Sequence, residues 1–120
     1  GEAMAAVHVR GELAEQLASS GDIGHPRSML QARFPQLGSQ LERLEEEWWY
    51  CPEQNSAQKE LYGRREPKNN LKIRLGRFRK WAMSRNEKVI VAFGHSTYFK
   101  ELMGGQHRRL RNGEMLKIQL

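Results

Sequence analysis

The feature that most constrains the fold of this 120-residue sequence is the run KVIVAF at residues 88–93, which is continuously apolar after Lys88. The run has the length of a strand and contains three β-branched residues. A continuous apolar stretch, rather than an alternating one, is typical of a strand whose two faces are both buried in the protein. The run ends at Gly94 and His95, and a short helical pattern, STYFKELM, follows it. The sequence therefore predicts a buried strand that leads through a histidine into a helix.

Other patterns extend this arrangement to most of the chain. The alternating segment AAVHV near the N-terminus and the alternating segment that ends at Leu120 predict two more strands, the latter after the turn signal Asn112-Gly113. Apolar residues from Leu71 to Ala82 are spaced four, three and four positions apart, which predicts an amphipathic helix. Since helices and strands alternate, we expect an α/β fold.

The rest of the sequence predicts shorter elements. We expect short helices within residues 11–20, 25–37 and 40–52, and a long loop from Pro52 to Asn70. The chain length fits one domain, so we expect residues 1–120 to form a single domain.

The charge of the chain is divided unevenly. The net charge is +6, but residues 1–58 carry four basic and nine acidic groups, and residues 59–120 carry sixteen basic and five acidic groups. A basic half is typical of a protein with an anionic partner, and also of an ordinary solvated face. Both interpretations remain open from composition alone.

Composition also restricts the compartment and the cofactors. A lone cysteine, Cys51, excludes an internal disulfide and fits a reducing compartment, so we expect a cytoplasmic protein. No stretch reaches the ~20 apolar residues of a membrane span, so we expect no membrane partner. No His or Cys pair stands at zinc-ligand spacing, so we expect no metal and no cofactor.

His95 is the first candidate site residue, because ligands of open α/β sheets bind beyond the carboxyl ends of the strands. A helix that begins there presents free backbone N–H groups and a partial positive charge. An imidazole donates a hydrogen bond or carries a positive charge near neutral pH. We therefore expect a phosphate or carboxylate at His95 and Ser96, although a histidine that only ends the strand fits the same spacing.

The segment VIVAFGHSTYFKELMGG resembles the second-histidine segment of the histidine phosphatase superfamily, also called phosphoglycerate mutase-like. VHVRGELAEQ is similar to the strand that leads into a Leu-x-Glu in that family, and GDIGHPRSMLQARFP and RLRNGEMLKIQL follow in the order of the family. The similarity runs from about Val7 to Leu120 and covers the C-terminal half of the family's domain. It implies an incomplete three-layer phosphoglycerate mutase-like sheet with helices on both faces.

The resemblance also implies a chemistry. In that family one histidine attacks a phosphoryl group, a carboxylic acid protonates the leaving oxygen, and a second histidine contacts the equatorial oxygens. The resemblance gives His95 the second-histidine role, with Ser96 as a further phosphate donor. It gives Glu15 the role of the acid or base, and Glu12 is the alternative match.

One part of the family pattern is missing. No Arg-His-Gly, the motif that carries the nucleophilic histidine, occurs in this sequence. We therefore expect a fragment or inactive relative that binds a phosphorylated small molecule and alone hydrolyses no phosphomonoester. Since the strand that would neighbour residues 88–93 is also missing, we expect a homodimer.

A different function class fits the basic half of the chain. Residues 64–80 and 108–111 are rich in Lys and Arg, which predicts a basic binding module for phosphate-rich ligands or nucleic acid. No nucleic-acid motif accompanies them, so nucleic acid is the weaker choice of partner. The remaining candidates, His8, His25 and His107, have structural roles in our interpretation, and Trp48 and Trp49 are predicted to be core or loop anchors.

Overall fold

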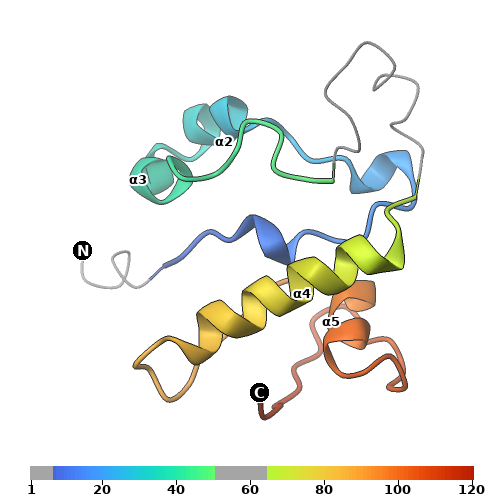
Figure 1. Cartoon of the computed structure of the whole chain (residues 1–120). Helices are drawn as coiled ribbons and strands as arrows, with labels where there is room; N and C mark the ends of the chain where they lie inside the picture. The colour runs from blue at the N-terminus through green and yellow to red at the C-terminus, as the bar shows by residue number, and fades with distance from the viewer. Residues whose placement is uncertain (1–6, 51–64) are drawn as a thin grey trace. The chain divides into compact units, whose positions relative to one another are not determined.

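The computed structural model describes residues 7–50 and 65–120. The chain divides into two compact units, and Figure 1 traces both. Unit 1 comprises the described residues 7–11, 17–50 and 65, and unit 2 comprises residues 12–16 and 66–120.

Helices are the sole regular elements in these described ranges. In chain order they are η1 (Gly11–Leu13), η2 (Ser20–Asp22), α2 (Arg27–Arg33), η3 (Pro35–Leu37), α3 (Gly38–Leu41), α4 (Lys68–Met83) and α5 (Ser96–Leu102). No strand or sheet occurs in residues 7–50 or 65–120. The prediction of an α/β fold, an incomplete three-layer phosphoglycerate mutase-like sheet, is therefore wrong.

The apolar run at residues 88–93 shows the physical reason for this correction. An apolar composition favours a strand only where a neighbouring strand supplies backbone partners and covers the side chains. Among the described residues, no backbone–backbone hydrogen bond involves residues 86–94. Val89 is 78% exposed and Phe93 is 87% exposed, so side chains typical of an interior strand lie at the surface.

The two other predicted strands are also wrong within the described residues. Residues 7–9 have no regular structure, and residues 5 and 6 lie outside the described ranges. The turn predicted at Asn112-Gly113 is confirmed, since Gly113 has a φ of 75° and the Glu114 amide donates to the Arg111 carbonyl at 3.0 Å. The residues after this turn reach the C-terminus without pairing to another described segment as a strand.

The amphipathic helix predicted from Leu71 onward is confirmed as α4. Pro67, with extended backbone angles, directly precedes its first residue. A backbone N–H at this position would have no partner inside the helix, so the proline costs α4 no hydrogen bond. One face buries all four predicted residues, Leu71, Leu75, Phe78 and Ala82. Gly76 lies on the exposed side, where an added Cβ would meet open space, so the helix tolerates it.

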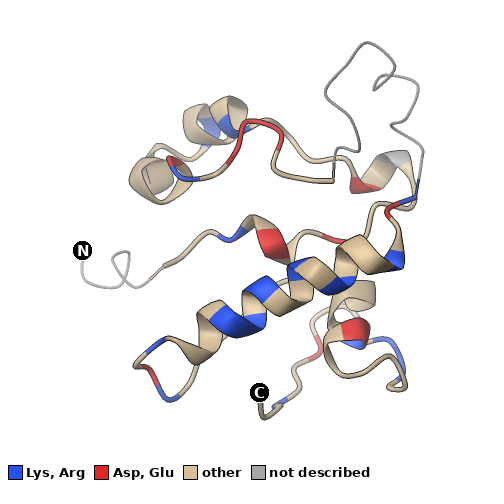
Figure 2. Ribbon diagram, viewed as in Figure 1, with Lys and Arg blue, Asp and Glu red and all other residues tan. Residues whose placement is uncertain are grey.

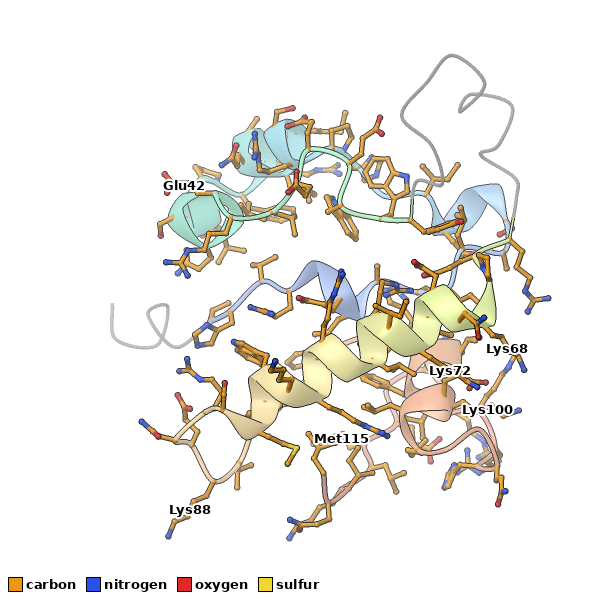
Figure 3. The ribbon with its side chains drawn as sticks, in the orientation of Figure 1. Glu42, Lys68, Lys72, Lys88, Lys100 and Met115 are labelled. Atoms are coloured by element: carbon orange, nitrogen blue, oxygen red, sulfur yellow. The ribbon has the colours of Figure 1, made fainter. Side chains whose placement is uncertain are left out.

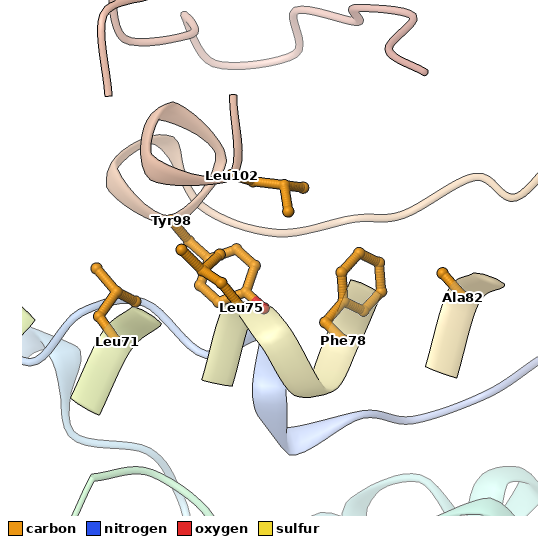
Figure 4. Packing of buried hydrophobic residues seen from close by; sticks show 6 residues of the cluster. All are labelled: Leu71, Leu75, Phe78, Ala82, Tyr98 and Leu102. Carbon is orange, nitrogen blue, oxygen red and sulfur yellow. The ribbon is translucent and has the colours of Figure 1, made fainter. Parts of the chain in front are cut away.

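The core of unit 2 lies between α4 and α5. Tyr98 and Leu102 of α5 point toward the apolar face of α4, as Figure 4 shows. The partly buried residues Leu13, Trp81, Ala92 and Phe99 pack around this cluster. Gly104 and Gly105 follow α5 at φ values of 95° and 78°, which only glycine adopts without strain.

Unit 1 is organised around two tryptophans. Gly24 passes so close to their rings that an added Cβ would lie 2.5 Å from Trp48 Cζ2 and 2.7 Å from Trp49 Cε3. The indole N–H of Trp48 donates to the His25 carbonyl at 2.7 Å. The Arg27 guanidinium donates to the Leu44 carbonyl at 2.8 Å. These contacts tie the segment before α2 to the segment after α3.

Of the shorter helices predicted for this part of the chain, the one within residues 25–37 is present as α2 and ends before Pro35. The helix predicted over residues 40–52 is confined to α3 and otherwise replaced by turns up to residue 50. The long loop predicted after Pro52 falls mostly outside the described residues.

Candidate functional site

Arg74 of α4 fixes the backbone of residues 12–16, the segment that carries the predicted acid. Its Nη1 donates to the carbonyl oxygens of Glu12 and Ala14 at 2.7 and 2.8 Å, and its Nη2 lies 3.4 Å from the Glu15 carbonyl. Ala14 and Glu15 lie in no regular element and Glu12 lies in the short η1, so the guanidinium supplies donors that these carbonyls would otherwise lack.

Glu66, immediately before Pro67 and α4, completes this frame. Its carboxylate accepts two hydrogen bonds from Arg74 and one from the side-chain amide of Asn70. Its backbone carbonyl accepts a hydrogen bond of 2.8 Å from the Gln16 side chain. Glu66 is 1% exposed, so its charge is buried together with that of its partner. The network connects the start of α4 with both ends of the Glu12–Gln16 segment.

The carboxylate of Glu15 caps α5. Its Oε2 accepts from the Thr97 amide at 3.1 Å, and its Oε1 accepts from the amides of Tyr98 and Gln16, both at 2.9 Å. The first N–H groups of a helix have no partner inside the helix, and a negative charge beside them is stabilising. His95, the N-cap residue, has extended backbone angles and makes no side-chain cap hydrogen bond. Glu15 therefore accepts hydrogen bonds from the first amides of α5, which in other helices a cap residue next to the helix accepts.

This contact brings together two regions that sequence reasoning had chosen separately. Glu15 and the segment of His95 and Ser96 are eighty positions apart in the sequence, and both belong to unit 2. Between the two alternatives for the predicted acid, the carboxylate of Glu15 makes the contact with α5, whereas Glu12 offers its backbone carbonyl to Arg74.

The same contact changes the prediction of an anion at the start of α5. Two amides that such an anion would use, those of Thr97 and Tyr98, already donate to a carboxylate of the chain itself. His95 is exposed and Ser96 is half-buried. The phosphate contact of these two side chains stays a prediction.

Sequence reasoning missed three residues of this region: Glu66, Arg74 and Tyr98. The first two had a signal, because Glu66, Asn70 and Arg74 follow one another at four-residue spacing and so share one side of a helix. Tyr98 has no such signal in the sequence, since the residues that surround it come from another helix.

Tyr98 lies wholly inside unit 2, with the Arg74 guanidinium carbon 5.4 Å from the centre of its ring. Its hydroxyl is buried and has no hydrogen-bond partner in this structure. Burial raises the pKa of the Tyr98 phenol well above its usual value, against a smaller opposite effect of Arg74. The phenol is therefore neutral at physiological pH and offers no nucleophile.

The exposed side of α4 carries several of the positive charges of unit 2. The helix contains no acidic residue, and Figure 2 shows Lys and Arg along its length. Five of its cations are exposed and outside the Glu66 network: Lys68, Lys72, Arg77, Arg79 and Lys80. Figure 3 labels Lys68 and Lys72, and both residues are exposed.

The other candidates have structural surroundings. Trp49 is buried and Trp48 is half-buried in unit 1, in agreement with their predicted role as anchors. The imidazole of His107 lies 2.8 Å from the Arg108 carbonyl. Cys51 lies outside the described residues. Within the described part of the chain, no group of three or more His, Cys, Asp or Glu side chains has the arrangement of a metal site.

No protein-family model matches this chain, and neither a curated protein nor a solved structure matches it. Among the helices that the structure describes, none has both the length and the apolar character needed to cross a lipid bilayer.

Proposed function

We propose that this chain is a phosphate-binding relative of the histidine phosphatases that lacks a nucleophile of its own. The observation that supports the proposal is the contact of the Glu15 carboxylate with the amides of Thr97 and Tyr98, directly after His95. In the resembled family, an acid from the first part of the chain and a second histidine from the last part serve one phosphoryl group. Here the two matching segments also meet.

In this proposal, the imidazole of His95 and the hydroxyl of Ser96 donate to the equatorial oxygens of a bound phosphoryl group. Glu15 acts beside them as the proton donor or acceptor for the bridging oxygen. Arg74 has a supporting role, because its hydrogen bonds to three carbonyls of residues 12–15 fix the backbone that carries Glu15. The ligand class is a phosphorylated small molecule, and the compartment we propose is the cytoplasm.

The proposal separates binding from turnover. Attack on phosphorus needs a nucleophile, and the sequence contains no Arg-His-Gly. We expect phosphate to bind weakly and nitrophenyl phosphate to be hydrolysed no faster than in buffer.

Binding is tested by titrating inorganic phosphate into isotope-labelled protein and recording the His95 imidazole and the Ser96 and Thr97 amides by NMR. The expected result is a saturable shift at millimolar phosphate that His95→Ala reduces. His107→Ala is the matched control, because His107 is also in the basic half but bonds locally to Arg108. Signals that do not move in wild-type protein overturn the binding proposal. Turnover that His95→Ala abolishes and His107→Ala leaves intact overturns the expectation of inactivity.

A second candidate function rests on α4. Its five exposed cations and the absence of acids within the helix fit a polyanion that binds through phosphate contacts. Combined replacement of Lys72 and Lys80 by glutamine should then weaken binding to a generic DNA duplex and reduce its salt dependence. If this double variant binds the duplex as wild-type protein does, at every salt concentration, this candidate is wrong.

A further inference from the structure

The apolar run after α4 exposes one of its two faces. Val89, Val91 and Phe93 are 78%, 64% and 87% exposed, whereas Ile90 is 39% exposed and Ala92 packs against the core of unit 2. Side chains that alternate between two faces are typical of an extended chain. One face of the run therefore lies on the core of unit 2. The other face, formed by Val89, Val91 and Phe93, is an exposed apolar stripe.

Exposed apolar side chains are concentrated in unit 2 as a whole. Thirteen large apolar residues have exposed side chains in the described part of the chain, and ten of them belong to unit 2. Single apolar residues at a surface are ordinary, whereas a group of them marks a contact with another protein or with a membrane. The apolar stripe is such a group, since its three residues lie within five consecutive positions.

Unit 2 is also strongly basic. Residues 12–16 and 66–120 contain thirteen basic and six acidic residues, a net charge of +7, whereas the described residues of unit 1 contain five of each. Lys88 is exposed and directly precedes the apolar stripe. A net positive charge attracts an anionic surface over about a Debye length, ~10 Å at 0.1 M salt. The partner that covers the stripe should therefore be both apolar and anionic.

Three kinds of partner differ in how well they fit these two properties. A second copy of unit 2 offers apolar side chains but approaches the stripe with the same positive charge. A nucleic acid offers negative charge, but aliphatic side chains such as Val89 and Val91 make no contact with phosphates. An anionic lipid surface offers both, because its headgroups attract cations and the acyl boundary below them accommodates apolar side chains.

We propose that the apolar stripe inserts into the boundary between headgroups and acyl chains of an anionic membrane, and that the positive charge of unit 2 holds it there. The membrane covers the exposed face of the stripe directly, so the run needs no strand partner. The expectation of no membrane partner concerns membrane spans, and binding at a membrane surface requires none. The proposal does not depend on the phosphate contact proposed for His95 and Ser96.

Cosedimentation with lipid vesicles tests the role of charge. Phosphatidylcholine vesicles that contain about 30% phosphatidylserine should bind the full chain at low salt. Vesicles of phosphatidylcholine alone should bind it at least about tenfold more weakly. Raising the salt concentration from about 0.05 to about 0.5 M should release most of the bound protein. No binding to the anionic vesicles, or equal binding to both kinds, overturns the proposal.

Replacing Phe93 tests the role of the stripe itself. Phe93→Gln keeps the net charge and should weaken binding to the anionic vesicles at least about fivefold, because the most exposed side chain of the stripe no longer leaves water on binding. Phe34→Gln is the matched control, since it is the same substitution at an exposed phenylalanine of unit 1 and should leave the affinity unchanged. Equal affinities of the two variants mean that the stripe does not insert, and overturn the proposal.

A fluorescent label that responds to polarity tests insertion directly, with Cys51→Ser in every variant so that the native thiol is not labelled. The label on Val91→Cys should shift to shorter wavelength when anionic vesicles are added, because position 91 then leaves water. The label on Met29→Cys, at an exposed apolar residue of unit 1, should not shift. If the stripe instead fits an acidic protein, vesicles leave the label at position 91 unchanged, and this result overturns the proposal.

Discussion

The guanidinium of Arg74 and the carboxylate of Glu66 form two parallel hydrogen bonds, Nε to Oε2 at 2.8 Å and Nη2 to Oε1 at 2.7 Å. The Glu66 side chain is completely buried, and that of Arg74 is 12% exposed. A buried ion pair adds little stability compared with an apolar pair, but removing one partner leaves the other charged and unpaired. The pair therefore fixes the geometry of unit 2 more than it raises its stability.

Arg74→Ala should lower the free energy of unfolding of unit 2 by about 3–5 kcal/mol, because Glu66 loses its partner and three carbonyls lose their donor. Urea denaturation followed by the helical signal measures the change. Arg77→Ala, at an exposed arginine of the same helix, should stay within about 0.5 kcal/mol of wild type. If the two variants unfold at the same urea concentration, the buried pair has no such role.

Tyr98→Phe should leave the free energy of unfolding unchanged or raise it by up to about 1 kcal/mol. The Tyr98 hydroxyl is buried without a partner in this structure, so folding removes it from water without compensation. Tyr98→Leu is the contrasting variant, since it also removes the ring that Arg74 and Phe99 contact and should destabilise. Clear destabilisation by Tyr98→Phe in urea denaturation would mean that the hydroxyl has a partner, such as a buried water.

The sequence predicts the helices of unit 2 well, and the reason is local. The four apolar residues of α4 recur at helical spacing, and the same spacing places them on one buried face. The apolar stretch at residues 88–93 is different, because strand formation depends on a partner that the stretch itself does not contain. Its composition indicates that it needs covering, and the structure shows that the described part of this chain does not cover it.

The candidate site could be predicted from the sequence only in part. The resemblance selected Glu15 and His95, and the contact between Glu15 and α5 joins their two segments. That the carboxylate itself would occupy the amides of Thr97 and Tyr98 could not be predicted, because it depends on the packing of residues far apart in the sequence. In the sequence, Arg74 is one of many cations in residues 64–80, whereas its hydrogen-bond partners lie in two separate segments, residues 12–15 and Glu66.

Gly24→Ala should destabilise unit 1 by about 1–3 kcal/mol, because the added methyl group would overlap the rings of Trp48 and Trp49. Tryptophan fluorescence during denaturation reports on this site directly. Gly38→Ala is the matched control, since Gly38 has helical backbone angles and no atom near its would-be Cβ. This control should be neutral or slightly stabilising. Equal effects of the two substitutions would contradict the close packing at Gly24.

The last prediction concerns the pH dependence of the turn between Arg108 and Glu114. The Arg108 side chain and the Arg111 amide donate to the Glu114 carboxylate, and these hydrogen bonds lower the pKa of Glu114 to about 2. A group whose pKa is lower in the folded protein stabilises it above the unfolded value, here 4.5, and this contribution is lost as the pH falls toward 2.

The carboxyl carbon of Glu114, followed by NMR as the pH is lowered, should therefore titrate with a midpoint near 2. Arg108→Gln removes the largest cause of the shift, so the midpoint should move back toward 4.5, while Arg109→Gln should leave it in place because the Arg109 side chain donates to no described partner of this turn. The backbone at Gly113, with its φ of 75°, should keep its turn conformation in both variants, so a change in midpoint reports on the ion pair rather than on unfolding of the turn. A wild-type midpoint near 4.5, or equal midpoints in the two arginine variants, would show that the Arg108–Glu114 pair does not form in solution.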